Sequence, residues 1–212
     1  MGRKESRIQS WTSRFLLTIF IIFTTQNLIS SPVDDHQERF EDVALKIWEY
    51  AELGYLEEKS SGLLQQELED SGFTIQAGIA GIPTAFIAEY NNGGPVLGIL
   101  GEFDALPGLS QQNVPFKTAE GLSSANGHAC GHHLFGAASA WAVVAIKEWL
   151  EESGTPGTIR FYGTPAEEGG SGKVYIARDG YFDDVDIVLH WHPASGNSAD
   201  AQSSNSNKSG KF

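Results

Sequence analysis

Cysteine is nearly absent from this sequence, since Cys130 is the only one among 212 residues. A single cysteine cannot form a disulfide within the chain, so the fold must depend on its apolar core, for which a hydrophobic fraction of 41% is sufficient. In an oxidising compartment we expect this thiol to be free, bound to a metal ion or oxidatively damaged.

Positive charge is scarce as well. The chain has 14 lysine and arginine residues against 27 aspartate and glutamate residues, which gives a formal net charge of −13. The first 31 residues hold four of the basic residues and only Glu5 as an acid, so the remainder is more acidic still. Such a surface argues against nucleic acid or an anionic membrane as a partner. An anionic substrate would need local attraction from a metal ion or an arginine.

Long hydrophobic runs are missing too. The stretch Phe15–Phe23 is broken by Thr18 and is shorter than the ~20 apolar residues of a membrane-spanning helix. A basic segment, Met1–Arg14, precedes it and Ser30-Ser31-Pro32 follows it, an order typical of a secretory signal. We therefore expect residues 1–31 to be a cleaved signal that directs export to the periplasm or the medium. The alternative is an uncleaved N-terminal membrane anchor.

Helical and strand patterns alternate along the rest of the chain. Helices are predicted over 34–50, 60–71, 134–152 and 171–179, the third of them buried, with His36 as a solvated residue where the first begins. Strands are predicted over 84–90, 96–100, 158–162 and 185–189. This alternation predicts an α/β fold with a mostly parallel sheet flanked by helices.

The most informative stretch is 126–133, which contains three of the six histidines and the only cysteine. A thiolate at Cys130 and an imidazole at His132 are ligands suited to Zn²⁺ or a similar divalent ion. Gly127 and Gly131 allow the backbone to turn tightly enough for both side chains to face one point.

Three further motifs stand at the ends of predicted strands. They are Glu102 with Asp104, Glu167 with Glu168, and His190 with His192. Ligands of open α/β sheets bind at the edge formed by the carboxyl ends of the strands. If strands 96–100 and 158–162 are neighbours, all four clusters converge on one crevice.

The roles of these residues follow from their directions. Glu167 and Glu168 are adjacent, so one carboxylate can bind an ion while the other faces a water molecule; we assign Glu168 as ligand and Glu167 as general base, and the reverse stays open. His192 is the better ligand of its pair because it lies nearer the strand end, while His190 is a core histidine or orients a ligand. Asp104 either orients a ligand or is a turn residue.

Other interpretations exist for each signal. Cys130 could be a buried thiol beside a helix start, and the two glutamates could be surface charges favoured by a helix dipole. A Cys–His nucleophile pair is a further alternative, but it leaves the glutamate pair and the distant histidines without a role.

Taken together, the motifs GEFDALPG, HACGH, GTPAEEGG and LHWHP, in this order, resemble the M20 metallopeptidase/amidohydrolase family. The resemblance covers about residues 38–212. It is closest to the branch of this family that contains proteins similar to p-aminobenzoyl-glutamate hydrolase.

The resemblance implies a catalytic domain with two divalent metal ions, zinc or manganese, that hydrolyses amide bonds in N-acyl or N-aroyl amino acids or dipeptides. The positions that match the family's residues are the ligands Cys130, His132, Glu168 and His192, the catalytic base Glu167, and Asp104 of the DALP motif. His133 departs from the pattern because relatives carry Asp or Asn there, and we expect it, like His190, to lie behind the ligands.

Relatives continue with a lid or dimerisation domain and a further histidine ligand. We therefore expect residues 36–212 to be the N-terminal portion of such a catalytic domain, with weak or no activity alone and a homodimer in the full-length form. A truncated, non-catalytic fragment that binds metal or a partner is the alternative.

Overall fold

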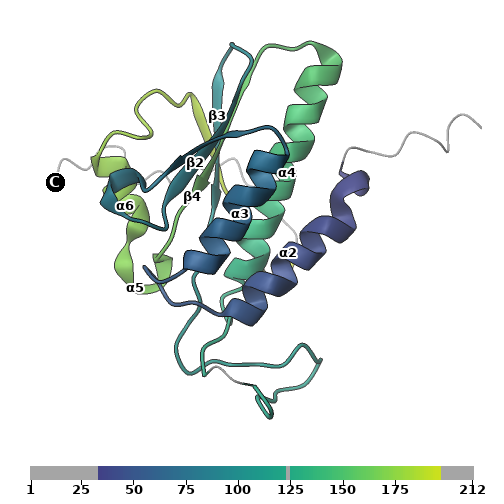
Figure 1. Ribbon diagram of the computed structural model, residues 1–212, viewed down its shortest axis with the longest axis vertical. Helices are drawn as coiled ribbons and strands as arrows, with labels where there is room; N and C mark the ends of the chain where they lie inside the picture. The colour runs from purple at the N-terminus through teal and green to yellow at the C-terminus, as the bar shows by residue number, and fades with distance from the viewer. Residues whose placement is uncertain (1–32, 123–124, 197–212) are drawn as a thin grey trace, which may run out of the picture.

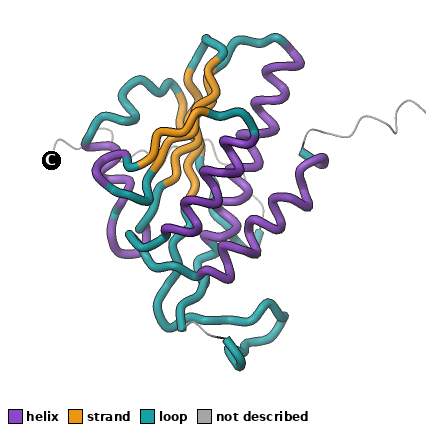
Figure 2. Tube along the Cα trace, viewed as in Figure 1, coloured by secondary structure: helices purple, strands orange, loops and turns teal. Residues whose placement is uncertain are grey.

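The computed structural model describes residues 33–122 and 125–196. A sheet forms the middle of the molecule, and helices pack against it (Figures 1 and 2). The predicted export signal and residues 197–212 lie outside the described residues. Within these two ranges, no helix has both the length and the apolar character needed to cross a membrane.

The helices follow the sequence pattern closely. The short 3₁₀ helix η1 (Asp34–His36) leads into α2 (Gln37–Tyr50), and α3 (Glu58–Asp70) and α4 (His132–Ser153) follow; η2 (Ile79–Gly81) is a second 3₁₀ turn. The helix predicted over 171–179 is α6 (Gly172–Arg178), and the short helix α5 (Glu167–Gly170) that precedes it was not predicted. Ser171 separates them because its φ of +55° lies in the left-handed region, where a helix cannot continue.

The sheet is mixed. Its strands are β1 (Thr74–Ala77), β2 (Phe86–Asn91), β3 (Val96–Gly101), β4 (Thr158–Gly163) and β5 (Ile187–Leu189), in the order β1-β2-β4-β3-β5. β4, β3 and β5 run parallel, whereas β2 is antiparallel to β4 and β1 is antiparallel to β2. The α/β class is confirmed, and the parallel part of the sheet is the part that carries the predicted site. β1 was not predicted, because this edge strand is largely exposed and lacks an apolar run.

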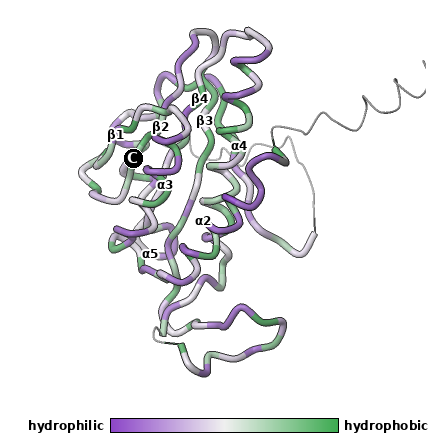
Figure 3. The backbone as a smooth tube through the Cα atoms, turned by 45° about the vertical axis from the view of Figure 1, so that its right-hand side comes forward, coloured by the Kyte–Doolittle hydropathy of each residue, from purple (hydrophilic) through white to green (hydrophobic). Residues whose placement is uncertain are grey.

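Successive residues of the central strands pack against opposite faces of the sheet, as strand geometry requires. One face, carrying Phe86, Ile99 and Phe161, packs under α2, α3 and α4. The other face, carrying Ile87, Leu100 and Tyr162, packs against η2 and α6. Figure 3 shows the corresponding hydrophobic colouring along β3 and much of α4. Apolar burial on both faces fixes the register of the strands and hence the place where each one ends.

His36 differs from the sequence prediction. Its Nε2 atom lies 2.7 Å from Oε1 of Glu148 on α4, and the side chain is 21% exposed. The residue therefore links the start of α2 to α4 rather than standing free in solvent.

Two helical glycines give a matched test of the packing. A Cβ on Gly62 of α3 would meet nothing within 4 Å, whereas a Cβ on Gly136 of α4 would lie 2.7 Å from the backbone oxygen of Glu102. We expect Gly62→Ala to raise the free energy of unfolding by about 0.5–1 kcal/mol, because alanine loses less backbone entropy. We expect Gly136→Ala to lower it by about 1–3 kcal/mol through overpacking. Urea unfolding measures both, and an equally stable Gly136→Ala would contradict the close approach of α4 to the end of β3.

Candidate metal centre

Three parallel strands bring their carboxyl ends to one edge of the sheet. β3 lies between β4 and β5 in parallel register, so the expected neighbours 96–100 and 158–162 are paired. The residues that follow these strand ends are Glu102 and Asp104 after β3, Glu167 and Glu168 after β4, and His190 and His192 after β5. α4 begins at His132, next to Cys130 and Gly131.

Cys130, His132 and His192 come together although up to 62 residues separate them. Each offers one ligand atom, and the three atoms lie within 4.8 Å of one another. The Sγ atom of Cys130 is 3.4 Å from Nε2 of His192. One sulfur and two imidazole nitrogens are a donor set suited to zinc.

The hydrogen bonds of the two histidines decide which ring nitrogen is available. Nδ1 of His132 lies 2.8 Å from Oδ1 of Asp104 and 3.1 Å from the backbone oxygen of Asp104. Nδ1 of His192 lies 3.0 Å from the backbone oxygen of Pro193. A carbonyl oxygen can only accept, so Nδ1 carries the proton in both rings. In its neutral form, each ring then presents the lone pair of Nε2 toward the cluster, as a metal ligand must.

A second group of donors shares His132. Its Nε2 lies 2.9 Å from Oε2 of Glu102 and 3.9 Å from Oε2 of Glu167, and the three residues can supply ligand atoms to one ion. Neither Nε2 of His132 nor Oε2 of Glu102 has a hydrogen-bond partner of good direction, although both atoms are buried. A lone pair facing a carboxylate at this distance repels it unless a proton or a cation lies between them. The buried donors therefore fit a bound divalent cation.

The charges around His132 favour a positive species at this place. Burial lowers the pKa of His132, but the carboxylates of Asp104 and Glu102 outweigh burial and raise it to about 10. Burial likewise raises the pKa of Glu102, but His132 and Lys173 outweigh it and lower the pKa below its usual value. Lys173 on α6 pairs with Oε1 of Glu102. When no metal ion is bound, a proton on Nε2 of His132 supplies this positive charge. A cation bound at Nε2 would replace that proton.

Cys130 lies among acids that keep its sulfur protonated in the absence of a cation. Burial raises the pKa of the thiol to about 11, and the nearby carboxylates of Glu168, Glu167 and Glu102 add to this shift. A nucleophilic cysteine needs the opposite, a pKa lowered by neighbouring positive charge. The raised pKa therefore gives no support to the Cys–His nucleophile pair.

Glu167 and Glu168 face different partners at the start of α5. The Glu167 carboxylate belongs to the group with Glu102 and His132, whereas the Glu168 carboxylate lies close enough to the Cys130 thiol to raise its pKa. The backbone N–H of Glu168 donates to Oδ2 of Asp104 at 3.0 Å. Glu167 belongs to one of the two donor groups and Glu168 belongs to neither, and the division of roles into base and ligand stays a prediction.

His190 and His192 lie beyond the end of β5 at Leu189, so strand alternation does not fix their directions. His190 is exposed, and its ring centroid lies 5.9 Å from that of Phe135. His133 is buried, and its ring packs against Trp48 at 4.7 Å and His128 at 5.2 Å. These contacts are not with predicted ligands, so the expectation that both histidines support the ligands stays a prediction.

Two buried polar residues near the site were missed in the sequence. His128 is 4% exposed, and its Nε2 donates to the backbone oxygen of Ile47 at 3.0 Å, which ties the Cys/His stretch to α2. Burial lowers its pKa to about 4. Glu57 is fully buried between α2 and α3. His128 could have been noticed because it lies inside the stretch 126–133. Nothing around Glu57 in the sequence indicates that Glu57 is buried.

Glu57 gives a prediction about pH. Burial raises its pKa from 4.5 to about 7, so the folded state binds a proton more tightly than the unfolded state and loses stability as pH rises from about 4.5 to 7. Glutamine has no proton to lose. We expect Glu57→Gln to be more stable than the parent above pH 7 by about 3 kcal/mol, with no difference below pH 4.5. Chemical unfolding across this pH range measures the effect. The exposed neighbour Glu58→Gln is the control, and a pH-independent difference for Glu57→Gln would contradict the raised pKa.

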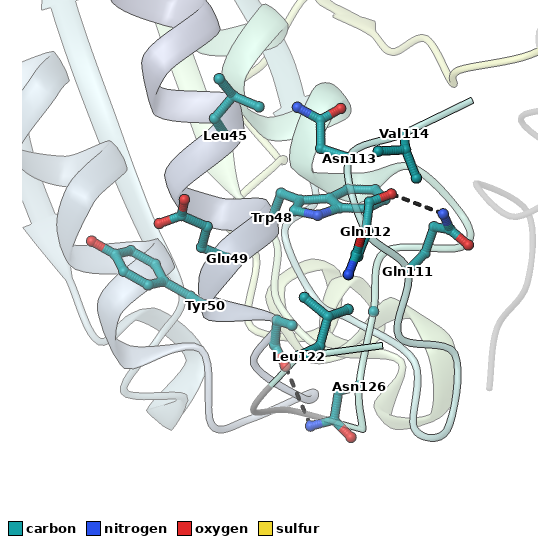
Figure 4. Close-up of a pocket in the computed structure, with 13 residues that line it drawn as sticks. Leu45, Trp48, Glu49, Tyr50, Gln111, Gln112, Asn113, Val114, Leu122 and Asn126 are labelled. Carbon is teal, nitrogen blue, oxygen red and sulfur yellow. Dashed lines mark hydrogen bonds between the residues drawn. The ribbon is translucent and has the colours of Figure 1, made fainter. Parts of the chain in front are cut away.

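A cavity of about 770 Å³ lies between α2 and the loop that follows β3. Trp48 of α2 faces Gln112 and Leu122 of the loop (Figure 4). The Asn126 side chain donates to the backbone oxygen of Ala51 at 3.3 Å and ties the loop to the end of α2. None of the predicted ligands and neither glutamate of the pair lines this cavity, so it is separate from the candidate metal centre.

Comparison with known proteins agrees with this arrangement. The model of peptidase family M20/M25/M40 matches residues 98–204. The chain is 46% identical over 165 residues to a p-aminobenzoyl-glutamate hydrolase subunit of Escherichia coli, covering 78% of this chain and 34% of that protein. It is 33% identical over 184 residues to human Xaa-Arg dipeptidase, covering 79% of this chain and 38% of that protein.

Among solved structures, the fold is similar to the YXEP protein of Bacillus subtilis, described as a dinuclear metal-binding peptidase from the M20 family. The TM-score is 0.62 at 28% identity, over 74% of this chain and 43% of that one. The chain spans about a third of the length of the curated relatives that it matches.

Proposed function

The chain belongs to peptidase family M20/M25/M40, and on that basis we propose that it carries the metal-binding and catalytic residues of a hydrolase of amide bonds. The observation that supports this most directly is the convergence of Cys130, His132 and His192. Both imidazoles are held with Nε2 free for a metal ion, and the sulfur lies beside one of them.

We propose that two divalent ions, zinc or manganese, are held by Cys130, His132, Glu168 and His192. When bound, such ions activate a water molecule and stabilise negative charge on the substrate carbonyl. Asp104 holds His132 in the tautomer that exposes Nε2, and it holds the turn that carries Glu168. Glu167 accepts the proton of the attacking water at a carboxylate oxygen and passes it to the leaving amine.

We propose N-acyl or N-aroyl amino acids, of which p-aminobenzoyl-glutamate is the first to test, or dipeptides as substrates. The proposal is supported by the names of the relatives, one a p-aminobenzoyl-glutamate hydrolase subunit and another an Xaa-Arg dipeptidase. The acidic surface of the chain makes local positive charge necessary for binding an anionic substrate.

The test is to assay the purified chain with p-aminobenzoyl-glutamate in the presence of Zn²⁺, of Mn²⁺ and of a chelator, and to measure bound metal in parallel. Metal-dependent release of glutamate supports the proposal. Activity that survives chelation indicates a Cys–His enzyme instead. Bound metal with no turnover of N-acyl amino acids or dipeptides indicates the non-catalytic fragment.

We also propose that residues 1–31 direct export. The basic and then apolar order of this segment supports the proposal. Expression with and without these residues tests it: the mature N-terminus of the exported protein should begin near Pro32, and retention of the whole chain in the cytoplasm would contradict export.

A further inference from the structure

Glu57 is a buried carboxylate that the proposed reaction does not use. It is fully buried, and its Oε1 accepts the backbone N–H of Ala166 at 2.8 Å while its Oε2 accepts the hydroxyl of Thr84 at 3.1 Å. Burying an ionisable group without a cationic partner destabilises a fold. Ala166, whose N–H Glu57 accepts, immediately precedes Glu167.

Ala166 needs to be held. Its φ of +56° and ψ of +43° are left-handed, a conformation that costs a residue with a Cβ roughly 1–2 kcal/mol. Among the described residues, five non-glycine residues have positive φ, and four of them lie in two segments, 51–55 and 166–171. Strained backbone of this kind persists only where its surroundings fix it, and it is concentrated at functional sites.

The two strained segments are in direct contact. A Cβ on Gly54 would lie 3.0 Å from the Cα of Ala166, and the Tyr55 hydroxyl hydrogen-bonds the backbone oxygen of Gly170. Glu57 completes this contact from the start of α3. The connection between α2 and α3 therefore forms a support for the turn that carries the glutamate pair.

The hydrogen bonds on either side of Glu167 come from two different carboxylates. Glu57 accepts the N–H of Ala166, and Asp104 accepts the N–H of Glu168. The backbone of Glu167 is thus fixed from both sides while its side chain stays free to act.

From this geometry we propose that Glu57 is a positioning residue: it holds Ala166 so that Glu167 faces the reacting atoms and Glu168 faces the metal centre. The inference rests on the proposed function, because it assigns these roles to the glutamate pair. Removing the carboxylate should release Ala166 and displace both glutamates, while leaving Cys130, His132 and His192 in place.

The experiment is a Co²⁺ titration of the full chain carrying Glu57→Ala, Glu57→Gln or Ser61→Ala. We expect Glu57→Ala to weaken Co²⁺ binding by about 10–100-fold, the range seen when groups that orient ligands are removed. The absorption from Cys130 thiolate to cobalt should remain. Glu57→Gln should bind Co²⁺ as the parent does, because the amide oxygen can accept the same N–H.

Ser61→Ala is the matched control. Ser61 is buried in the same region and donates to the backbone oxygen of Thr84 at 2.8 Å, but it does not touch the turn. This variant should lose thermal stability and keep the Co²⁺ affinity of the parent. A folded Glu57→Ala with parental affinity and an unchanged cobalt spectrum would overturn the proposal.

Two further measurements keep the outcomes separate. If Glu57→Ala does not fold, Gly54→Ala displaces Ala166 from the other side and should weaken Co²⁺ binding in the same way. Parental Co²⁺ binding by Gly54→Ala overturns the proposal.

If the parent binds no Co²⁺, the proposed metal centre fails. Amide exchange at Ala166 and Glu168 then tests the support alone, and the amides of Glu57→Ala should exchange faster than those of Ser61→Ala, whereas equal rates overturn it.

Discussion

Replacing Glu167 by glutamine is expected to lower the rate of metal-dependent hydrolysis by about 10²–10⁴-fold, the usual contribution of a general base. The amide cannot accept the proton of the attacking water, although it has the size of the carboxylate. Bound metal should stay unchanged, because the proposed ligands are other residues. Steady-state kinetics and metal analysis of the same preparation measure the two quantities together.

The matched variant is Glu168→Gln, which alters the neighbouring carboxylate on the same short helix. It should lose metal and activity together, since Glu168 lies near enough to Cys130 to raise its pKa and is assigned as a ligand. If Glu167→Gln is the variant that loses metal, the two roles are reversed. If neither substitution changes rate or metal content, the pair has no part in the reaction.

Replacing Cys130 by alanine is expected to weaken Zn²⁺ binding by more than about 100-fold, beyond the loss caused by removing a group that only orients a ligand. The sulfur is the only thiol in the chain, so the absorption from thiolate to cobalt should vanish in the Co²⁺ form. Competition with a coloured chelator measures the affinity. Metal binding should also release protons at pH 8, because the pKa of the Cys130 thiol is about 11 and that of His132 about 10, whereas the ligands are the thiolate and the neutral imidazole.

His36→Ala is the control for this experiment. His36 pairs with Glu148 at the start of α2 and is absent from both donor groups among the described residues. It should bind Zn²⁺ as the parent does. A Cys130→Ala protein with parental affinity would mean that the sulfur does not bind the metal.

The sequence allowed prediction of those parts of the fold that depend on local pattern. The apolar run Val96–Leu100 and the turn after it predicted both β3 and the place where Glu102 and Asp104 emerge. Gly154, with φ of +67°, ends α4 where the sequence predicted. β1 carried no such pattern, because an exposed edge strand is held by pairing with β2 and not by burial of its own side chains.

The candidate site could be predicted as a set of residue types but not as a geometry. Residues of the types that bind metal ions stand at the predicted strand ends, and the pairing of β3 with β4 confirms that strands 96–100 and 158–162 are neighbours. The tautomers of His132 and His192 depend on backbone oxygens that only the folded chain brings near. Glu57 could not be predicted at all, since its burial results from packing against a turn 109 residues away.

The most direct test is the position of zinc in crystals of the chain, located by anomalous scattering at the zinc edge. We predict zinc ions among Cys130, His132, Glu168 and His192, with one zinc ion about 2.3 Å from the sulfur of Cys130. Zinc bound elsewhere, with the Cys130 sulfur bound to no ion, would contradict this prediction.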